Sequence, residues 1–146
     1  MVDIRFSKNF RLSEFVRSST ATSKGIDNTP SDTVVLNLYC LVYNVIQPLR
    51  DWCGESVTIS SGYRCAKLNK AVGGVSNSQH MTGEAADIHI PDVKTGKRWF
   101  EYLKHFTSYD QLIWEHDKNG VYWIHVSCRR DTSKNRKQVI NELLKK

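Results

Sequence analysis

The sequence has no apolar run long enough to cross a membrane and no hydrophobic core of a signal peptide. A membrane helix needs about 18 to 20 apolar residues in succession. The N-terminal stretch 1–10 instead interrupts its apolar residues with Asp3, Arg5 and Lys8. We therefore expect no export signal, so that a role outside the cytoplasm would need another route of delivery.

Cysteine is present, but not in the patterns that build a metal ribbon or a disulfide framework. The cysteines at 40, 53, 65 and 128 have neither C-x-x-C spacing nor the density of a disulfide scaffold. Cys40 falls in an apolar helical stripe, where a small core residue is expected. We interpret all of them as reduced structural thiols.

The remaining composition is that of an ordinary globular domain with an uneven charge. Hydrophobic residues make up 40% and charged residues 25% of 146 residues, which suffices for one domain with its own core. The net charge is +6, and residues 129–146 carry seven basic against two acidic side chains. Such a basic tail indicates either an anionic polymer as partner or a solvated helix face.

Apolar periodicity predicts one central helix. We expect it to begin with Thr29 as the N-cap and Pro30 in the first turn, to kink at Pro48 and to end at Gly54. Its apolar stripe has spacings of three and four residues. The stripe comprises Val34, Leu38, Leu41, Val45, Leu49 and Trp52, widened by Val35, Val42 and Ile46.

Shorter segments complete the predicted fold, an α+β domain. Strands are expected at 57–60, 85–90, 111–115 and 121–128, helices at 64–72 and 97–106, and a basic helix from Asn135 onward. The turn sequence Asp117-Lys118-Asn119-Gly120 predicts a hairpin between the last two strands. We expect one domain, 1–146, with N-terminal helices on a small, mostly antiparallel sheet and a basic C-terminal tail, 129–146.

The densest group of potential metal ligands lies in residues 78–87. His80 and Asp87 supply an imidazole and a carboxylate, and Gly83 permits a turn between them. A catalytic zinc needs about three protein ligands and leaves a further position for water. His125, in a later strand, is the candidate third ligand. Each histidine alone is more typical of a hydrogen-bonded core residue than of a metal ligand, so spacing leaves both interpretations open.

The order of the motifs resembles the LAS metallopeptidases, which include zinc D,D-carboxypeptidases and phage L-alanyl-D-glutamate endopeptidases. The similarity consists of S-x-H-x-x-G-x-A-x-D at 78–87, W-x-H-V-S at 123–127 and S-G-Y-R at 61–64, and extends over roughly residues 12–127. The resemblance implies a hedgehog/D,D-peptidase-like fold. It also implies that His80, Asp87 and His125 bind Zn²⁺.

The same resemblance implies a substrate, the stem peptides of bacterial peptidoglycan, and its contacts. Arg64 matches an arginine that holds a substrate carboxylate or carbonyl through its planar fork of donors. Ser78 matches a position that borders the substrate. Trp123 shares a strand face with His125 and is expected to shape the pocket. The zinc would polarise the scissile carbonyl and activate water.

The general base departs from the family pattern. Many members carry Glu or Asp three residues before the last histidine, where this chain has Tyr122, and a phenol that titrates near 10 accepts a water proton poorly at neutral pH. We expect Glu115 to act instead, because a hairpin places it opposite Tyr122–Ile124. Glu84, His89, His116 and Asp117 are further acid-base groups to consider.

Two functions from different classes follow. The first is zinc-dependent hydrolysis of stem peptides, as an endopeptidase or a carboxypeptidase, by a monomer made in the cytoplasm and released through a pore, as for a phage or prophage enzyme. The second, motivated by Tyr122, is a catalytically silent, zinc-containing module that binds the wall. The basic tail would contact anionic wall polymers. Nucleic acid is not expected, because the tail has no aromatic residue for base stacking, and no membrane partner is expected.

Overall fold

A single mixed sheet organises the fold, which a computed structural model describes for residues 2–145. The sheet has five strands in the order β1-β2-β4-β3-β5. Neighbouring strands are antiparallel except β3 and β5, which are parallel. The strands are β1 (Thr58–Ser61), β2 (Ala85–His89), β3 (Gln111–His116), β4 (Tyr122–Ser127) and β5 (Gln138–Leu144). The predicted α+β class is confirmed.

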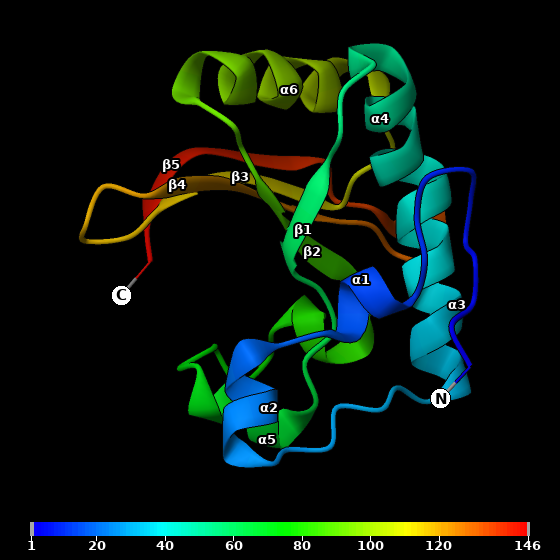
Figure 1. The fold of residues 1–146 in the computed structure, drawn as a ribbon. Helices are drawn as coiled ribbons and strands as arrows, with labels where there is room; N and C mark the ends of the chain where they lie inside the picture. The colour runs from blue at the N-terminus through cyan, green and yellow to red at the C-terminus, as the bar shows by residue number, and fades with distance from the viewer. Residues whose placement is uncertain (1, 146) are drawn as a thin grey trace.

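Helices lie on both sides of the sheet. In the orientation of Figure 1, α6 and α4 lie above the strands, and α2 and α5 lie below them. No helix in the described range 2–145 is both long and apolar enough to cross a bilayer. The helical elements are α1 (Ser13–Val16), α2 (Ser19–Lys24), α3 (Asp32–Leu41), the π-helical η1 (Val42–Ile46), α4 (Gln47–Cys53), α5 (Ala66–Ala71), η2 (Gln79–Thr82), α6 (Val93–Phe106) and η3 (Thr132–Lys134).

The predicted central helix is a continuous rod formed by α3, η1 and α4. Its N-cap is Ser31 rather than Thr29, because the Ser31 hydroxyl accepts a hydrogen bond from the N–H of Val34 at 3.3 Å. The expected disturbance at Pro48 takes the form of the π-helical segment just before it, where the regular ladder is interrupted. The rod ends as predicted at Gly54, which has a φ of 67°.

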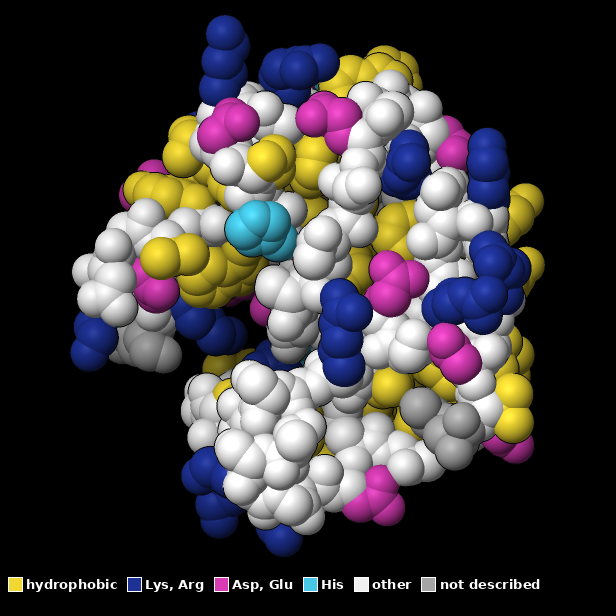
Figure 2. Space-filling model, viewed as in Figure 1, with side chains coloured by type: hydrophobic (Ala, Val, Ile, Leu, Met, Phe, Trp, Pro, Cys, Tyr) yellow, Lys and Arg dark blue, Asp and Glu magenta, His cyan; other side chains and the backbone are white. Residues whose placement is uncertain are grey.

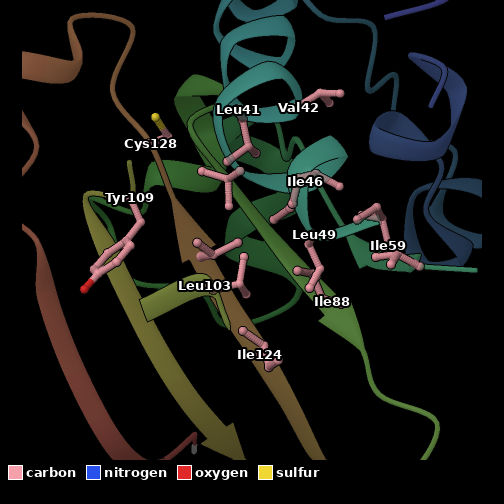
Figure 3. Packing of buried hydrophobic residues seen from close by; sticks show 14 of the residues in the cluster. Leu41, Val42, Ile46, Leu49, Ile59, Ile88, Leu103, Tyr109, Ile124 and Cys128 are labelled. Carbon is pink, nitrogen blue, oxygen red and sulfur yellow. The ribbon is translucent and has the colours of Figure 1, made fainter. Parts of the chain in front are cut away.

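The apolar stripe of this rod packs against the sheet. Leu41 and Leu49 meet Ile88 of β2 and Ile124 of β4 in one buried cluster (Figure 3). Each such side chain contributes about 2 kcal/mol by leaving water. This core fixes one face of the sheet against helices and leaves the other face available for a site.

Two residues that were predicted to lie in the core, Trp52 and Cys40, lie outside it. Trp52 is 46% exposed, and its ring stacks on Tyr102 with centroids 4.6 Å apart. Trp52 lies in the last turn of α4, and Tyr102 belongs to α6. All the cysteines are free thiols, and Cys40 is only partly buried. The core assignments of Trp52 and Cys40 are therefore wrong.

The C-terminal segment is a strand and not the basic helix that we expected. Strand β5 covers the edge of β3, whose N–H and C=O groups would otherwise lack partners. Ile140 pairs with Ile113, and Leu143 with Glu115, so the register shifts by one residue between these pairs. This bulge places Ile140 and Leu143 on one face although they are three residues apart, a spacing that is typical of a helix.

Part of the tail's positive charge is neutralised within the fold. Asp110 is fully buried and lies 2.8 Å from Nη2 of Arg136 and 3.2 Å from Nε of Arg129. Its carboxylate also accepts a hydrogen bond from Gln79 at 3.0 Å. Arg130 donates to the side chain of Asn37 at 3.0 Å. These contacts account for part of the basic tail without an external polymer.

Replacing Asp110 with Asn is expected to destabilise the protein by about 2 kcal/mol at pH 7, less than for a fully buried pair because both arginines are partly exposed. Burial would raise the pKa of Asp110, but hydrogen bonds from Arg136 and Gln79 outweigh it and hold this pKa well below its usual value. Because the pKa of Asp110 is lower in the folded state than the unfolded value of about 4, the ionised carboxylate stabilises the folded protein at pH values above 4. This stabilisation is lost as the pH falls from about 4 toward the folded-state pKa.

Urea unfolding at pH 7 and pH 3 measures this effect. The difference in free energy of unfolding between wild type and Asp110→Asn should be smaller at pH 3. The exposed carboxylate control, Glu55→Gln, should differ little from wild type at either pH. An Asp110→Asn difference that stays constant between the two pH values would contradict the assignment.

Candidate metal centre

Three side chains from separate elements converge on one point. The potential ligand atoms of His80, Asp87 and His125 all lie within 4.8 Å of one another. The Nε2 atom of His80 is 3.3 Å, and the Nδ1 atom of His125 is 3.0 Å, from the same Oδ1 atom of Asp87. The structure therefore brings together the three residues that the sequence predicted as ligands.

Local backbone structure explains this convergence. Asp87 on β2 and His125 on β4 are direct cross-strand partners, so their side chains project from the same spot on the sheet. His80 lies in η2, and its N–H donates to the hydroxyl of Ser78 at 3.2 Å. Gly83 ends η2 with a φ of 78°, a conformation that favours glycine and turns the chain into β2.

A backbone carbonyl orients His80. Its Nδ1 atom lies 2.7 Å from the carbonyl oxygen of Gly62. Because a carbonyl can only accept, Nδ1 carries the proton and Nε2 presents its lone pair toward Asp87. A side chain at Gly62 would collide with the backbone of Phe15. The S-G-Y-R motif thus supports His80 as well as supplying Arg64.

The electrostatics of the cluster suit a divalent cation. Burial would raise the pKa of Asp87, but the charges and hydrogen bonds of His80 and His125 in their protonated forms outweigh it and hold this pKa far below its usual range. Metal binding requires neutral imidazoles, and a divalent cation would then supply the positive charge that this partly buried carboxylate needs. Two histidines and one carboxylate are also a common ligand set of catalytic zinc. The residues present therefore fit the zinc that the motif implied.

The cluster lies where two cavities border each other. Asp87, Arg64 and Trp123 line one of about 300 Å³, named here the Arg64 cavity. His80 and Ser78 line the other, of about 280 Å³, named the Ser78 cavity. Figure 2 shows the molecule hollowed between the strands and the lobe of α2 and α5, with Lys and Arg side chains beside the opening. All three predicted substrate-contacting residues, Arg64, Ser78 and Trp123, thus lie at this cleft.

Arg64 has a free donor. Its side chain is buried, and within residues 2–145 its Nε atom has no hydrogen-bond partner. Burial lowers the pKa of Arg64, while the nearby carboxylates of Asp87 and Glu115 oppose that change. This Nε atom is enclosed by protein, but Arg64 lines the Arg64 cavity, where its guanidinium group is suited to bind an anionic or carbonyl oxygen.

Asn28 positions the Arg64 segment, a role that the sequence alone did not indicate. Its side-chain amide donates to the carbonyl of Val16 at 2.9 Å and to that of Tyr63 at 3.0 Å. Its side-chain oxygen accepts from the N–H of Cys65 at 2.8 Å. In the sequence, Asn28 follows Gly25-Ile26-Asp27 and is indistinguishable from an ordinary loop asparagine, because every partner except Val16 lies more than 30 residues away.

Glu115 lies beside the ligands. It is 3% exposed and pairs with Trp123 across β3 and β4. The Oε1 atom accepts a hydrogen bond from Nε1 of Trp123 at 3.0 Å and lies 3.8 Å from Nδ1 of His125. Within residues 2–145 the Oε2 atom has no hydrogen-bond partner. Trp123 therefore orients a buried carboxylate that lines the Ser78 cavity.

Tyr122 faces the opposite side of the sheet. Side chains alternate along a strand, so a residue three positions from His125 projects away from it. The ring of Tyr122 stacks on His116 with centroids 4.9 Å apart and lies 5.7 Å from that of Trp114. Neither Tyr122 nor His116 lines a cavity of the described cleft.

Three further acid-base groups near the ligands in sequence also lie away from the cleft. Asp117 accepts hydrogen bonds from the hairpin turn, at Asn119 and Val121. Glu84 accepts a hydrogen bond from Thr82 at 2.6 Å. His89 is exposed. In the described part of the chain, Asp117, Glu84 and His89 line neither cavity, which leaves Glu115 as the carboxylate at the site besides the candidate ligand Asp87.

Comparison with known proteins agrees with this geometry. The family model described as Peptidase M15 matches residues 8–127. A zinc D-Ala-D-Ala carboxypeptidase from Streptomyces albus G is 33% identical over 81 residues, which are 55% of this chain and 31% of that relative. The chain thus spans about a third of the relative's length. The match extends over η2, β2 and β4, which carry all three candidate ligands, and the chain belongs to the peptidase M15 family.

Proposed function

We propose that this protein is a zinc-dependent peptidase that hydrolyses peptide bonds in bacterial peptidoglycan stem peptides. The observation that carries the proposal is the convergence of His80, Asp87 and His125 beside the buried carboxylate of Glu115. Support comes from the peptidase M15 family and from a relative named as a zinc D-Ala-D-Ala carboxypeptidase. Whether cleavage is internal or terminal is a separate question that product analysis answers.

Zinc held by His80, Asp87 and His125 would supply Lewis acidity toward the scissile carbonyl and lower the pKa of water at the site. The Gly62 carbonyl keeps His80 in the tautomer that presents Nε2. The pairing of β2 with β4 keeps Asp87 and His125 side by side. These contacts of the chain with itself fix the positions of the candidate ligands.

Glu115 acts as the general base. Its Oε1 atom is held by Trp123 at 3.0 Å, and the carboxylate takes a proton from the attacking water. The same carboxyl can return this proton to the leaving amine. Arg64 lines the Arg64 cavity and binds a carboxylate or carbonyl oxygen of the peptide through its guanidinium group. Ser78 borders the same substrate from the opposite cavity.

A second candidate function, a catalytically silent wall-binding module, is motivated by Tyr122 alone. A buried carboxylate 3.8 Å from His125 supplies the group that Tyr122 lacks and supports the hydrolytic proposal. A silent module would sediment with insoluble wall and release no product. Binding of anionic wall polymers by the tail is compatible with either function, and Lys134 is an exposed cation available for it.

The proposal is tested by incubating purified peptidoglycan with the zinc-loaded protein and measuring new free amino groups. Wild type should release them, and His80→Ala should not. Equal release by both proteins would reject the proposed function. Sedimentation of the same samples separates loss of wall binding from loss of hydrolysis.

A further inference from the structure

We propose that the C-terminal segment 138–145 forms one wall of the substrate cleft, and that Lys145 binds a free carboxylate of the bound peptide. This inference rests on the proposed function and specifies how its substrate is recognised. The M15 match ends at residue 127, so β5 lies outside the matched region. The wall is therefore a feature that the family assignment does not supply.

The bulge in β5 turns its apolar residues toward the site. Ile140 pairs with Ile113, and Leu143 pairs with Glu115. Paired residues share a face of the sheet, so both project to the side that carries Glu115. Ile140 and Leu143 accordingly line the Ser78 cavity together with Ile113. A tail that formed a free helix would leave this side of the cavity open.

Lys145 lies at the junction of the two cavities. It lines both the Arg64 cavity and the Ser78 cavity. Its backbone N–H donates to the carbonyl of His116 at 2.7 Å, which fixes its place at the end of β5. Lys145 is partly buried, and it forms no ion pair with any acidic residue in the range 2–145.

The charges of the cleft indicate the chemistry of the ligand. Arg17, Arg64 and Lys145 line the Arg64 cavity, whose only acidic residue in the described chain is Asp87. Because Asp87 belongs to the metal cluster, the cations remain available to substrate. Carboxylates are the anionic groups that a stem peptide offers. A carboxylate held at Lys145 would place the neighbouring peptide bond beside the metal ligands, since Lys145 shares its cavities with all of them.

Peptide binding tests the inference separately from hydrolysis. The zinc-loaded Glu115→Gln protein, with its activity suppressed, is titrated with a stem peptide bearing free carboxylates and with the same peptide fully amidated. Mass spectrometry confirms that the peptide stays intact. Adding Lys145→Met should weaken binding of the carboxylate peptide about tenfold, the loss expected for one charge-assisted hydrogen bond. Binding of the amidated peptide should not change.

Matched variants exclude a structural effect. Lys145→Arg preserves the charge and should retain most of the affinity, and Lys118→Met removes an exposed lysine from the hairpin turn and should have no effect. The inference is overturned if Lys145→Met weakens both peptides equally, weakens neither, or if the carboxylate peptide does not bind. Failure of the wild-type protein to cleave peptidoglycan would reject the proposed function. The binding of the two peptides could still be compared between the Lys145 variants.

Discussion

Replacing His80 with Ala is expected to lower the affinity for zinc at least about a hundredfold, because even outer contacts of a zinc site contribute 10- to 100-fold and His80 is a direct ligand. Hydrolysis of peptidoglycan should fall to the background of a metal-free sample. The fold should persist, since the core lies on the opposite face of the sheet from the ligands.

Zinc affinity is measured by competition with a chromophoric chelator, and folding by circular dichroism. The matched control is His89→Ala, which removes an exposed histidine two residues beyond Asp87 on the same strand. This control should bind zinc as wild type does. Zinc binding that is equal in His80→Ala and wild type would place the metal elsewhere.

Replacing Glu115 with Gln is expected to reduce kcat about a thousandfold, the typical contribution of a positioned general base. The amide keeps the shape of the side chain and can still accept a hydrogen bond from Trp123, but it cannot take a proton. Zinc affinity should stay within about threefold of wild type, because Glu115 is not one of the clustered ligands and the effect of an outer group is small by comparison.

Steady-state kinetics on a stem peptide, together with zinc titration, separates these effects. Tyr122→Phe is the decisive control, since it alters the position that carries the base in many family members. The ring of Tyr122 stacks on His116 away from the ligands, so its hydroxyl should be dispensable and kcat should change by less than about twofold. A large loss of kcat in Tyr122→Phe, together with full activity in Glu115→Gln, would contradict the assignment of Glu115 as the general base and give that role to Tyr122.

The candidate metal ligands were predicted from the order of the motifs, and local rules account for part of the geometry around them. The Asp117–Gly120 turn sequence specifies a hairpin, and the hairpin register places Glu115 opposite Trp123. The face of His125 then follows from strand alternation. His80 and Asp87 were predicted by motif order rather than by spacing. Their approach depends on the pairing of β2 with β4, which no short segment encodes.

The tail could not be predicted because its conformation depends on a distant partner. Residues 138–144 contain apolar residues at helical spacing, and only the unpaired edge of β3 makes a bulged strand the better solution. The position of Lys145 could not be predicted for the same reason, because Lys145 lies at the cleft only when β5 pairs with β3. Asn28 was missed because its hydrogen bonds join loops far apart in the chain.

Local competition explains the smaller errors. Thr29 and Ser31 are both good N-cap residues. Ser31 caps the helix because the Thr29 hydroxyl donates a hydrogen bond to the Asp27 carboxylate at 2.6 Å. Trp52 continues the apolar stripe in sequence, but it lies in the last turn of α4, where its ring stacks on Tyr102 of α6 at the surface.

The central claim is that zinc held by His80, Asp87 and His125 supports hydrolysis of stem peptides. Mass spectrometry of purified peptidoglycan, digested by the wild-type protein with zinc and with a chelator, tests it most directly. We predict new fragments whose masses correspond to cleavage of one type of peptide bond, absent with the chelator and restored by added zinc. Fragments that form equally well with the chelator, or no new fragments with zinc, would contradict the account.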